Sequence, residues 1–251
     1  MATKVLVIGA GIAGLSTASY LQRNGFDTEI FELHDKPGGL CTAWSRNGYT
    51  FDGCIHWLMG SGRSSNLHHI WEELGAGGLD YVEWDVYTVV RLSGGDSFTV
   101  YTDPDRLEAE MLRLGPADRR FARIISSNVR RVRNADLPGA FDKLSIREAA
   151  SLALAMPPVL PVLMKWAKTP LSTLVDGLRS PALREAFSVL YGDAMPDFPA
   201  AGLFMMLGFM AKRSCGYPKG GSLAFARAIE SRYLALGGKI NYGFKVDRII
   251  V

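Results

Sequence analysis

Three glycines and one acidic residue near the N-terminus have the spacing of a nucleotide-phosphate site. Gly9, Gly11 and Gly14 follow a short apolar run, and Glu32 stands about 20 residues further on. In such a loop the first glycine allows a tight turn, the second lets the backbone approach a pyrophosphate, and the third lets the helix pack closely. The helix N-terminus attracts phosphate, and the carboxylate accepts hydrogen bonds from a ribose diol. The pattern indicates a dinucleotide site that disfavours NADP, whose 2′-phosphate Glu32 would repel; a glycine turn without a nucleotide is the alternative.

These residues need a strand, a helix and a second strand to position them. Residues 4–8 are apolar after Lys4 and mostly β-branched, which predicts a buried parallel strand. Residues 12–24 predict a helix that ends at Gly25, and residues 28–32 predict the second strand. Together they form one βαβ unit with a right-handed crossover.

The rest of the chain divides into an inserted segment and a final segment that belongs to the first domain. Residues 84–102 carry a β-hairpin signal around Gly94-Gly95, and residues 105–213 are mostly helical in pattern. Residues 223–236 predict a helix, 239–241 a strand, and a further strand begins at Lys245. We expect an α/β fold: a Rossmann-like domain of residues 1–80 and 217–251, interrupted by a mostly helical substrate domain of residues 81–216.

The segment after Glu32 separates FAD from NAD. Residues 32–42, ELHDKPGGLCT, resemble the extended fingerprint of the glutathione-reductase-like FAD proteins, in which a glycine pair and a Ser or Thr line the cofactor. The family usually has Arg where this chain has Leu40, so that contact is absent or supplied elsewhere. The resemblance implies FAD as the cofactor, lined by Gly9, Gly11, Ile12, Ala13, Gly14, Glu32, Leu33, Gly38, Gly39, Leu40 and Thr42.

Two further segments resemble the phytoene dehydrogenase-related proteins, which include carotenoid desaturases, carotenoid isomerases and retinol saturases. These segments are residues 48–56, GYTFDGCIH, and 217–222, YPKGGS, with the run from Gly237 to Val246 behind them. The resemblance implies an FAD-dependent oxidoreductase that desaturates, isomerises or saturates an apolar, isoprenoid or carotenoid-like substrate by hydride transfer. It also implies that Val246 lies beside the adenine and His56 toward the isoalloxazine ring.

Members of that group are about twice as long and carry a second FAD contact segment near their C-terminus. We therefore expect a missing C-terminal half or a second chain. Two alternative functions remain open: an amine- or porphyrinogen-oxidase-type flavoenzyme, and a non-catalytic prenyl- or lipid-binding protein of the same fold, like the Rab GDP-dissociation inhibitors.

Three residues near the expected flavin carry groups that could take part in chemistry. His56 could bond flavin or substrate or move a proton, or its ring could be satisfied by local backbone bonds. Asp52 precedes a glycine and is read as a turn residue. Cys41 is read as a small packed residue, because no partner thiol is visible in the sequence.

Composition bounds the remaining classes. A net charge of +3 is too slight to imply nucleic acid, and three cysteines without a paired motif predict neither a disulfide framework nor a metal site. We expect a cytoplasmic protein without a spanning helix. Two apolar stretches, 152–164 and 198–211, fit a lipid tunnel or buried helices. The arginines between 119 and 133 predict a basic amphipathic helix, either in peripheral contact with a membrane or simply solvated.

Overall fold

The chain divides into two compact units in a computed structural model that describes residues 2–135, 159–192, 195 and 197–250. Unit 1 comprises Met1–Val82 and Gly216–Val251, and unit 2 comprises Glu83–Cys215. These limits lie next to the boundaries expected at residues 80 and 217. Unit 1 is thus assembled from both ends of the chain, while unit 2 is one continuous stretch.

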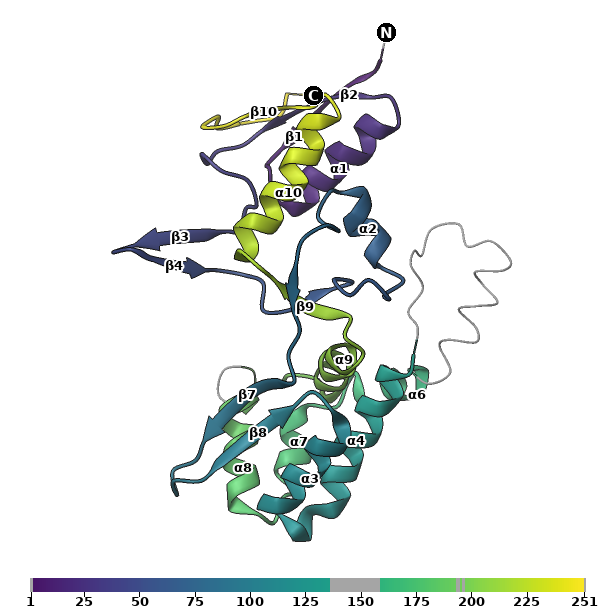
Figure 1. The fold of residues 1–251 in the computed structure, drawn as a ribbon, viewed down its shortest axis with the longest axis vertical. Coiled ribbons are helices and arrows are strands. Elements are labelled where there is room, and N and C mark those ends of the chain that lie inside the picture. The colour runs from purple at the N-terminus through teal and green to yellow at the C-terminus, as the bar shows by residue number, and fades with distance from the viewer. Residues whose placement is uncertain (1, 136–158, 193–194, 196, 251) are drawn as a thin grey trace, which may run out of the picture. The chain divides into compact units, whose positions relative to one another are not determined.

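Unit 1 is built on a parallel three-stranded sheet (Figure 1). Strand β2 (Asp27–Phe31) lies between β1 (Lys4–Ile8) and β10 (Lys239–Asn241), and all its pairings are parallel. Helix α1 (Ile12–Arg23) makes the crossover from β1 to β2, and α10 (Gly221–Ala235) leads into β10. The predicted first strand and the strand at 239–241 have the observed bounds. The predicted first helix ends one residue later than α1, and the predicted second strand, 28–32, is shifted by one residue at both ends relative to β2.

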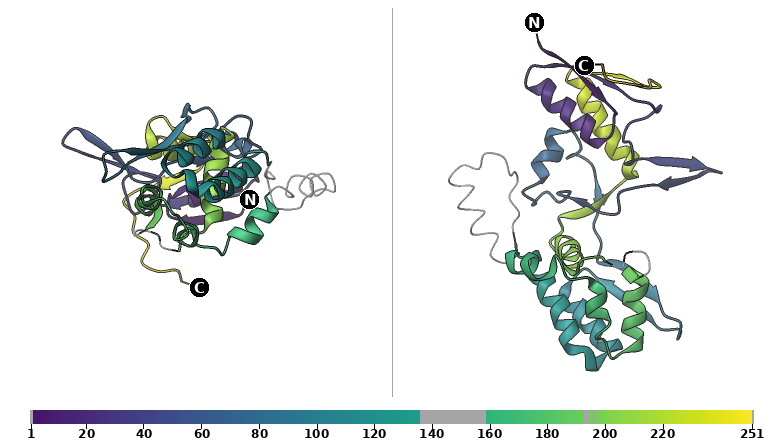
Figure 2. Two further views of the ribbon diagram at one scale, coloured as in Figure 1. Left: turned by 90° about the horizontal axis from the view of Figure 1, so that it is seen from below. Right: turned by 180° about the vertical axis from the view of Figure 1, so that it is seen from behind.

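One face of this sheet is the core of unit 1. Helices α1 and α10 lie side by side against it (Figures 1 and 2). The Tyr233 hydroxyl donates a 2.9 Å hydrogen bond to the carbonyl of Thr28, so α10 is fastened to the central strand. The opposite face is open, because Leu6 and Ile8 of β1 are 59% and 55% exposed. The buried side chains of the covered face include Leu15, Ala18, Ile30, Phe225, Ile229 and Tyr233.

A β-hairpin projects from unit 1 after the first βαβ unit. Its strands β3 (Ala43–Arg46) and β4 (Tyr49–Asp52) are antiparallel. Both turn residues have positive φ, 53° at Asn47 and 79° at Gly48, which is the two-residue hairpin turn that asparagine and glycine favour. Trp44 and Phe51 stack across the ribbon with ring centroids 5.9 Å apart. The sequence analysis did not predict this hairpin.

A second small sheet completes unit 1, and the sequence analysis did not predict it either. It has the order β5-β9-β6, with β5 at Leu58–Met59, β9 at Cys215–Pro218 and β6 at Tyr81–Val82. Helix α2 (His68–Glu73) lies between β5 and β6 in the chain. Strands β6 and β9 pair Val82 with Tyr217, so the two ends of unit 1 that flank the insertion are direct neighbours.

Unit 2 opens with the predicted hairpin, β7 (Val86–Arg91) paired with β8 (Ser97–Tyr101). Helix α3 begins at Pro104, because the Asp103 carboxylate accepts from the N–H groups of Asp105 and Arg106. Figure 2 shows the helices of this unit, which pack on one another. They are α3 (Pro104–Leu114), η1 (Pro116–Asp118), α4 (Arg119–Arg133), α6 (Leu160–Trp166), α7 (Leu171–Val175), α8 (Pro181–Phe187), η2 (Ser188–Gly192, a π-helical turn) and α9 (Ala200–Ala211).

Helix α9 accounts for most of the second apolar stretch. Its methionines Met206 and Met210 are 6% and 3% exposed, and the helix packs on α4. That arrangement is a buried helix of the unit 2 core. In the first stretch, residues 152–158 lie outside the described residues. Among the helices that are described, none has both the length and the hydropathy to cross a membrane.

One expected strand is wrong. From Phe244 to Ile250 the chain forms no strand, although β10 precedes it as predicted. Two backbone bonds, from Gly243 to His34 and from Phe244 to Glu32, hold its beginning beside the end of β2. No strand among the described residues pairs with the segment that follows, and an extended segment without a neighbour has no ladder to join.

Candidate dinucleotide site

The glycine loop lies where β1 ends and α1 begins, at the carboxyl edge of the parallel sheet. Gly9 has a φ of 94°, which favours glycine, and its N–H donates to the Phe31 carbonyl at 2.8 Å. Gly14 is required for packing instead. A Cβ on Gly14 would lie 2.1 Å from the Gly9 carbonyl oxygen, so the helix could not approach the loop as it does.

Gly11 needs to be glycine neither for a positive φ nor for close packing. Its backbone is extended, with φ −67° and ψ 171°, and any residue adopts that conformation. A Cβ there would meet only the Gly38 carbonyl oxygen, at an ordinary 3.9 Å. Gly11 is also the N-cap of α1, which has no side-chain cap and no acidic residue in its first turn. The first N–H groups of α1 and the bare Cα of Gly11 therefore leave room for a group from outside the described chain.

The segment that carries the glycine pair returns beside this loop. The Gly38 N–H donates to the Ala10 carbonyl at 2.8 Å, and a Cβ on Gly39 would lie 3.3 Å from the Gly11 Cα. A few residues on, the Thr42 Oγ1 atom is buried and has no hydrogen-bond partner among the described residues. A buried hydroxyl without a partner is costly, and a ligand oxygen or nitrogen at this position would satisfy it.

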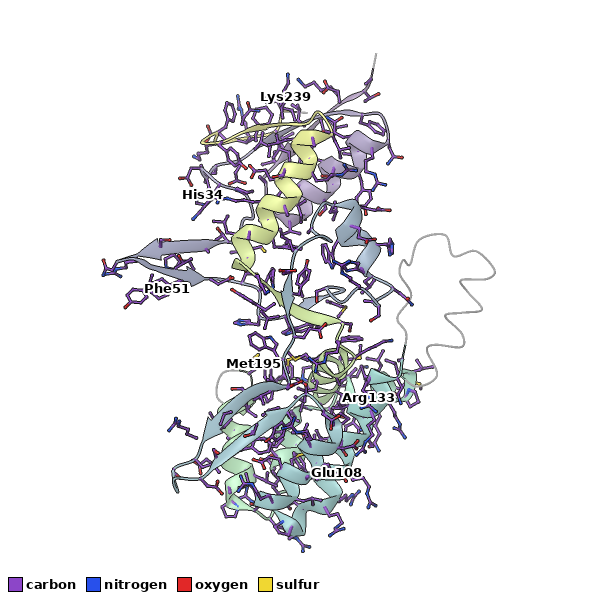
Figure 3. All side chains as sticks on the ribbon, viewed as in Figure 1. His34, Phe51, Glu108, Arg133, Met195 and Lys239 are labelled. Atoms are coloured by element: carbon purple, nitrogen blue, oxygen red, sulfur yellow. The ribbon has the colours of Figure 1, made fainter. Side chains whose placement is uncertain are left out.

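Glu32 lies at the end of β2 with its carboxylate turned to the loop. One carboxylate oxygen accepts from the Ala10 N–H at 2.6 Å and the other from the His34 N–H at 2.8 Å. Glu32 is 6% exposed, so these bonds hold a buried charge. A carboxylate has about four lone-pair positions, which leaves acceptor capacity for a ribose diol. Figure 3 marks His34, which follows Glu32 on the segment after β2.

Asp52 joins two segments that the sequence analysis read separately. Its carboxylate accepts from the Ser222 N–H and from the Tyr217 hydroxyl, each at 2.7 Å, and also from the Ser222 hydroxyl. The Ser222 hydroxyl in turn accepts from the Ile55 N–H at 2.8 Å. The segments 48–56 and 217–222 therefore meet at one carboxylate, far beyond the local turn that the Asp-Gly pair indicated.

The electrostatics of this junction follow from those bonds. Burial acts to raise the pKa of Asp52, but the hydrogen bonds from Ser222 and Tyr217 outweigh it and lower the pKa below its usual value. The same bond, together with burial, raises the pKa of Tyr217 to about 12. Asp52 is thus held as a carboxylate and Tyr217 as a neutral donor. That is the state of a structural junction, consistent with the turn role rather than a catalytic one.

The other residues predicted to line the cofactor have fewer described contacts with the glycine loop and Glu32. Ile12 is partly buried and Ala13 exposed in the first turn of α1, while Leu33 and Leu40 are 57% and 91% exposed. His56 is exposed and makes no hydrogen bond within the described residues, so the local backbone bonds considered for it are not seen. Val246 is partly buried in the irregular segment after β10. The structure brings together Gly9, Gly11, Gly14, Glu32, Gly38 and Gly39, and Thr42 follows them on the segment after the glycine pair.

Comparison with known proteins agrees with this geometry. The model of the NAD(P)-binding Rossmann-like domain family matches residues 7–74. The inactive all-trans-retinol 13,14-reductase of Danio rerio is 26% identical over 98% of this chain and 42% of its own length. A lycopene-forming phytoene desaturase of Pseudescherichia vulneris is 26% identical over 99% of this chain and 50% of its own length. This chain is a relative of the phytoene desaturases and retinol 13,14-reductases. It spans about half the length of the curated relatives it matches.

Solved structures show the same fold. An oxidoreductase from Methanosarcina mazei matches 99% of this chain and 53% of its own, with a TM-score of 0.55 and 20% identity. A putrescine oxidase matches 96% and 51%, with a TM-score of 0.53 and 16% identity. The Rab GDP-dissociation inhibitor of Plasmodium falciparum matches 96% and 58%, with a TM-score of 0.50 and 11% identity. The fold is therefore common to oxidoreductases and to a protein of another class, so it does not decide the function.

Proposed function

We propose that unit 1 binds FAD and that the chain belongs to an oxidoreductase acting on an apolar, isoprenoid or carotenoid-like molecule. The substrate class comes from the relatives, whose names specify retinol and phytoene. FAD, when bound, would supply the hydride-accepting or hydride-donating ring. Because desaturation and saturation differ only in the direction of hydride transfer, the proposal covers both.

Gly11 carries the proposal. The fold itself does not need glycine there, since backbone and space both admit a side chain. A pyrophosphate approaching the start of α1 would need that space. Each other residue then has a role: the N–H groups at the start of α1 hold the phosphates, Glu32 accepts from the ribose, and the Thr42 hydroxyl bonds the ligand. His56 and Val246 stay candidates for the ring end and the adenine end.

The test is a pair of glycine substitutions. Gly11→Leu places a side chain in the ligand's space, where its Cβ makes only an ordinary contact with the Gly38 carbonyl oxygen, so we expect a nearly unchanged melting temperature and at least tenfold weaker FAD binding. Gly78→Leu is the control at an open position, because a Cβ at Gly78 meets nothing within 4 Å. This control should change neither the melting temperature nor the affinity for FAD. Equilibrium dialysis and isothermal titration with FAD and with ADP measure the affinities. Equal binding of FAD and of ADP by the parent and by Gly11→Leu would contradict this site.

We also propose that α4 mediates peripheral contact with an anionic membrane, through one half of its arginines. Arg130 is paired with Asp105 and Glu108 at 2.6 and 2.7 Å. Arg119, Arg120 and Arg123, in contrast, line a surface hollow with Ile124 and Ser127 and form no ion pair with any described carboxylate.

Vesicle sedimentation tests this contact. Changing Arg119, Arg120 and Arg123 together to Gln should abolish binding to phosphatidylserine vesicles, because each basic group near an anionic surface contributes about 1 kcal/mol. Arg131→Gln, which removes an exposed arginine bonded to Asn128, is the control. Equal binding by the triple variant and the parent would refute the contact.

A further inference from the structure

Two of the three cysteines lie opposite each other at the base of the β3–β4 hairpin. The register pairs Ala43 with Asp52, and the Gly53 N–H donates to the Thr42 carbonyl at 3.0 Å, which continues the pairing by one step. Along an antiparallel pair, each step back on one strand is a step forward on the other. Cys41 and Cys54 are the next residues on the two segments, just beyond the ends of β3 and β4.

The two thiols differ in their surroundings. Cys41 is 7% exposed, and its sulfur lies 3.6 Å from the Ser222 carbonyl oxygen, to which it donates. Cys54 is exposed to solvent. Burial, and after it the charge and hydrogen bond of the neighbouring Cys54 thiol, raise the pKa of Cys41 to about 12. The two thiols therefore lie near enough for Cys54 to influence the pKa of Cys41, and Cys54 is open to reagents whereas Cys41 is shielded.

We propose that Cys41 and Cys54 form a reversible intramolecular disulfide. Directly opposed residues of an antiparallel pair have Cα atoms about 4.5–5.5 Å apart, within the range of about 4.4–6.8 Å that a disulfide spans. The bond would tie the segment that follows Gly38-Gly39 to the end of β4. It requires neither FAD nor a substrate, so it is independent of the proposed function.

The oxidant we name is a low-molecular-weight disulfide such as oxidised glutathione. The Cys54 thiolate attacks one glutathione sulfur, so a mixed disulfide forms and one glutathione thiolate leaves. The Cys41 thiolate then attacks the Cys54 sulfur and displaces the second glutathione thiolate. Two electrons pass from the two cysteines to the reagent, and the two cysteine protons are taken up by the released thiolates. The shielded thiol acts only in the second step, so that step should accelerate as the pH rises.

The experiment uses the full chain, reacted with oxidised glutathione at about pH 7 and about pH 9, where more thiolate is present. Peptide mapping by mass spectrometry should find residues 41 and 54 linked at the higher pH, with a mass loss of two hydrogens. Free thiols should fall from three to one and return with dithiothreitol. Cys215→Ala, which removes the third cysteine, should leave the linkage unchanged.

Two variants test the order of the two steps. Cys54→Ser, at an exposed position, should leave Cys41 unmodified, whereas Cys41→Ala should stop the reaction at the mixed disulfide on Cys54. A terminal mixed disulfide in the parent at both pH values, or linkage through Cys215, would each overturn the proposal.

Discussion

Asp52 shows how much one side chain can hold together. It receives hydrogen bonds from Ser222 and Tyr217, which lie on the other end of the chain, and from the local Cys54 N–H at 3.2 Å. Gly221 allows the close approach of Asp52, because a Cβ on Gly221 would lie 2.3 Å from a carboxylate oxygen of Asp52. The junction therefore joins the two chain ends of unit 1 by charge-assisted bonds, which are stronger than neutral ones.

This junction predicts a pH dependence of stability. The pKa of Asp52 is lower in the folded chain than its usual value, so its contribution is complete above about pH 4 and is lost as the pH falls through the folded value. Asp52→Asn should be less stable than the parent at about pH 7, and the gap should narrow towards about pH 3. Urea unfolding at a series of pH values measures it. Asp247→Asn, at an exposed position, is the control. A difference in unfolding free energy between the parent and Asp52→Asn that does not change with pH would show that Asp52 is not held as the carboxylate.

The sequence could not have predicted the partners of Asp52. The Asp-Gly pair indicated a local turn, but Asp52 is the last residue of β4, and Ser222, which bonds to it, is 170 residues away with no local pattern that links the two. The nearness of Cys54 to Cys41 could not be predicted for a similar reason, because it depends on a hairpin register, whereas Cys41 is buried as its interpretation as a packed residue expects. In contrast, the roles expected for Gly9 and Gly14 follow from the local turn and the helix that it starts, and here the φ of Gly9 and the packing of Gly14 agree with expectation.

At the level of elements, prediction succeeded where a regular apolar pattern was followed by a glycine that ends it. The strand that stops before Gly9 and the helix that stops near Gly25 both have this combination. Strands β5 and β6 have two residues each, too few for any period, and they exist only because β9 pairs between them. The hairpin at Asn47-Gly48 did have a local signal, since that dipeptide favours a two-residue turn. The strand expected at Lys245 had a pattern but found no neighbour.

The contact between α4 and α9 gives a prediction for unit 2. A Cβ on Gly208 would lie 2.4 Å from Val132 Cγ1 and 3.2 Å from the Arg133 nitrogen, so Gly208→Ala forces the helices apart. We expect the free energy of unfolding to fall by about 1–3 kcal/mol. Gly177→Ala is the matched control, because its Cβ would make an ordinary 3.6 Å contact, with Leu174. Urea denaturation followed by circular dichroism measures both, and equal stability of the two variants would contradict this packing.

At the scale of the whole molecule, the pairing of Val82 with Tyr217 means that unit 2 is inserted between neighbouring residues. Insertions of this kind are tolerated because the host's ends already lie together. Replacing residues 83–215 by a short Gly-Ser linker should therefore leave unit 1 folded, with cooperative thermal unfolding. A variant that keeps the linker but carries Tyr217→Asp should lose that cooperativity. If the linker replacement itself unfolds without a cooperative transition, unit 1 depends on the insertion.

The same interruption sets an order of events on the ribosome. Strand β2 is finished by Phe31, but its partner β10 begins only at Lys239. Roughly 200 residues separate them, and at about 5–20 residues per second the open side of β2 waits about 10–40 s for its neighbour. Unit 2 is contiguous and can fold within that delay. Meanwhile the nascent βαβ unit presents an unpaired strand edge, the kind of surface on which chains join one another. The demand for chaperones should thus be greatest before α10 and β10 emerge, and slow translation of the insertion should lower the yield.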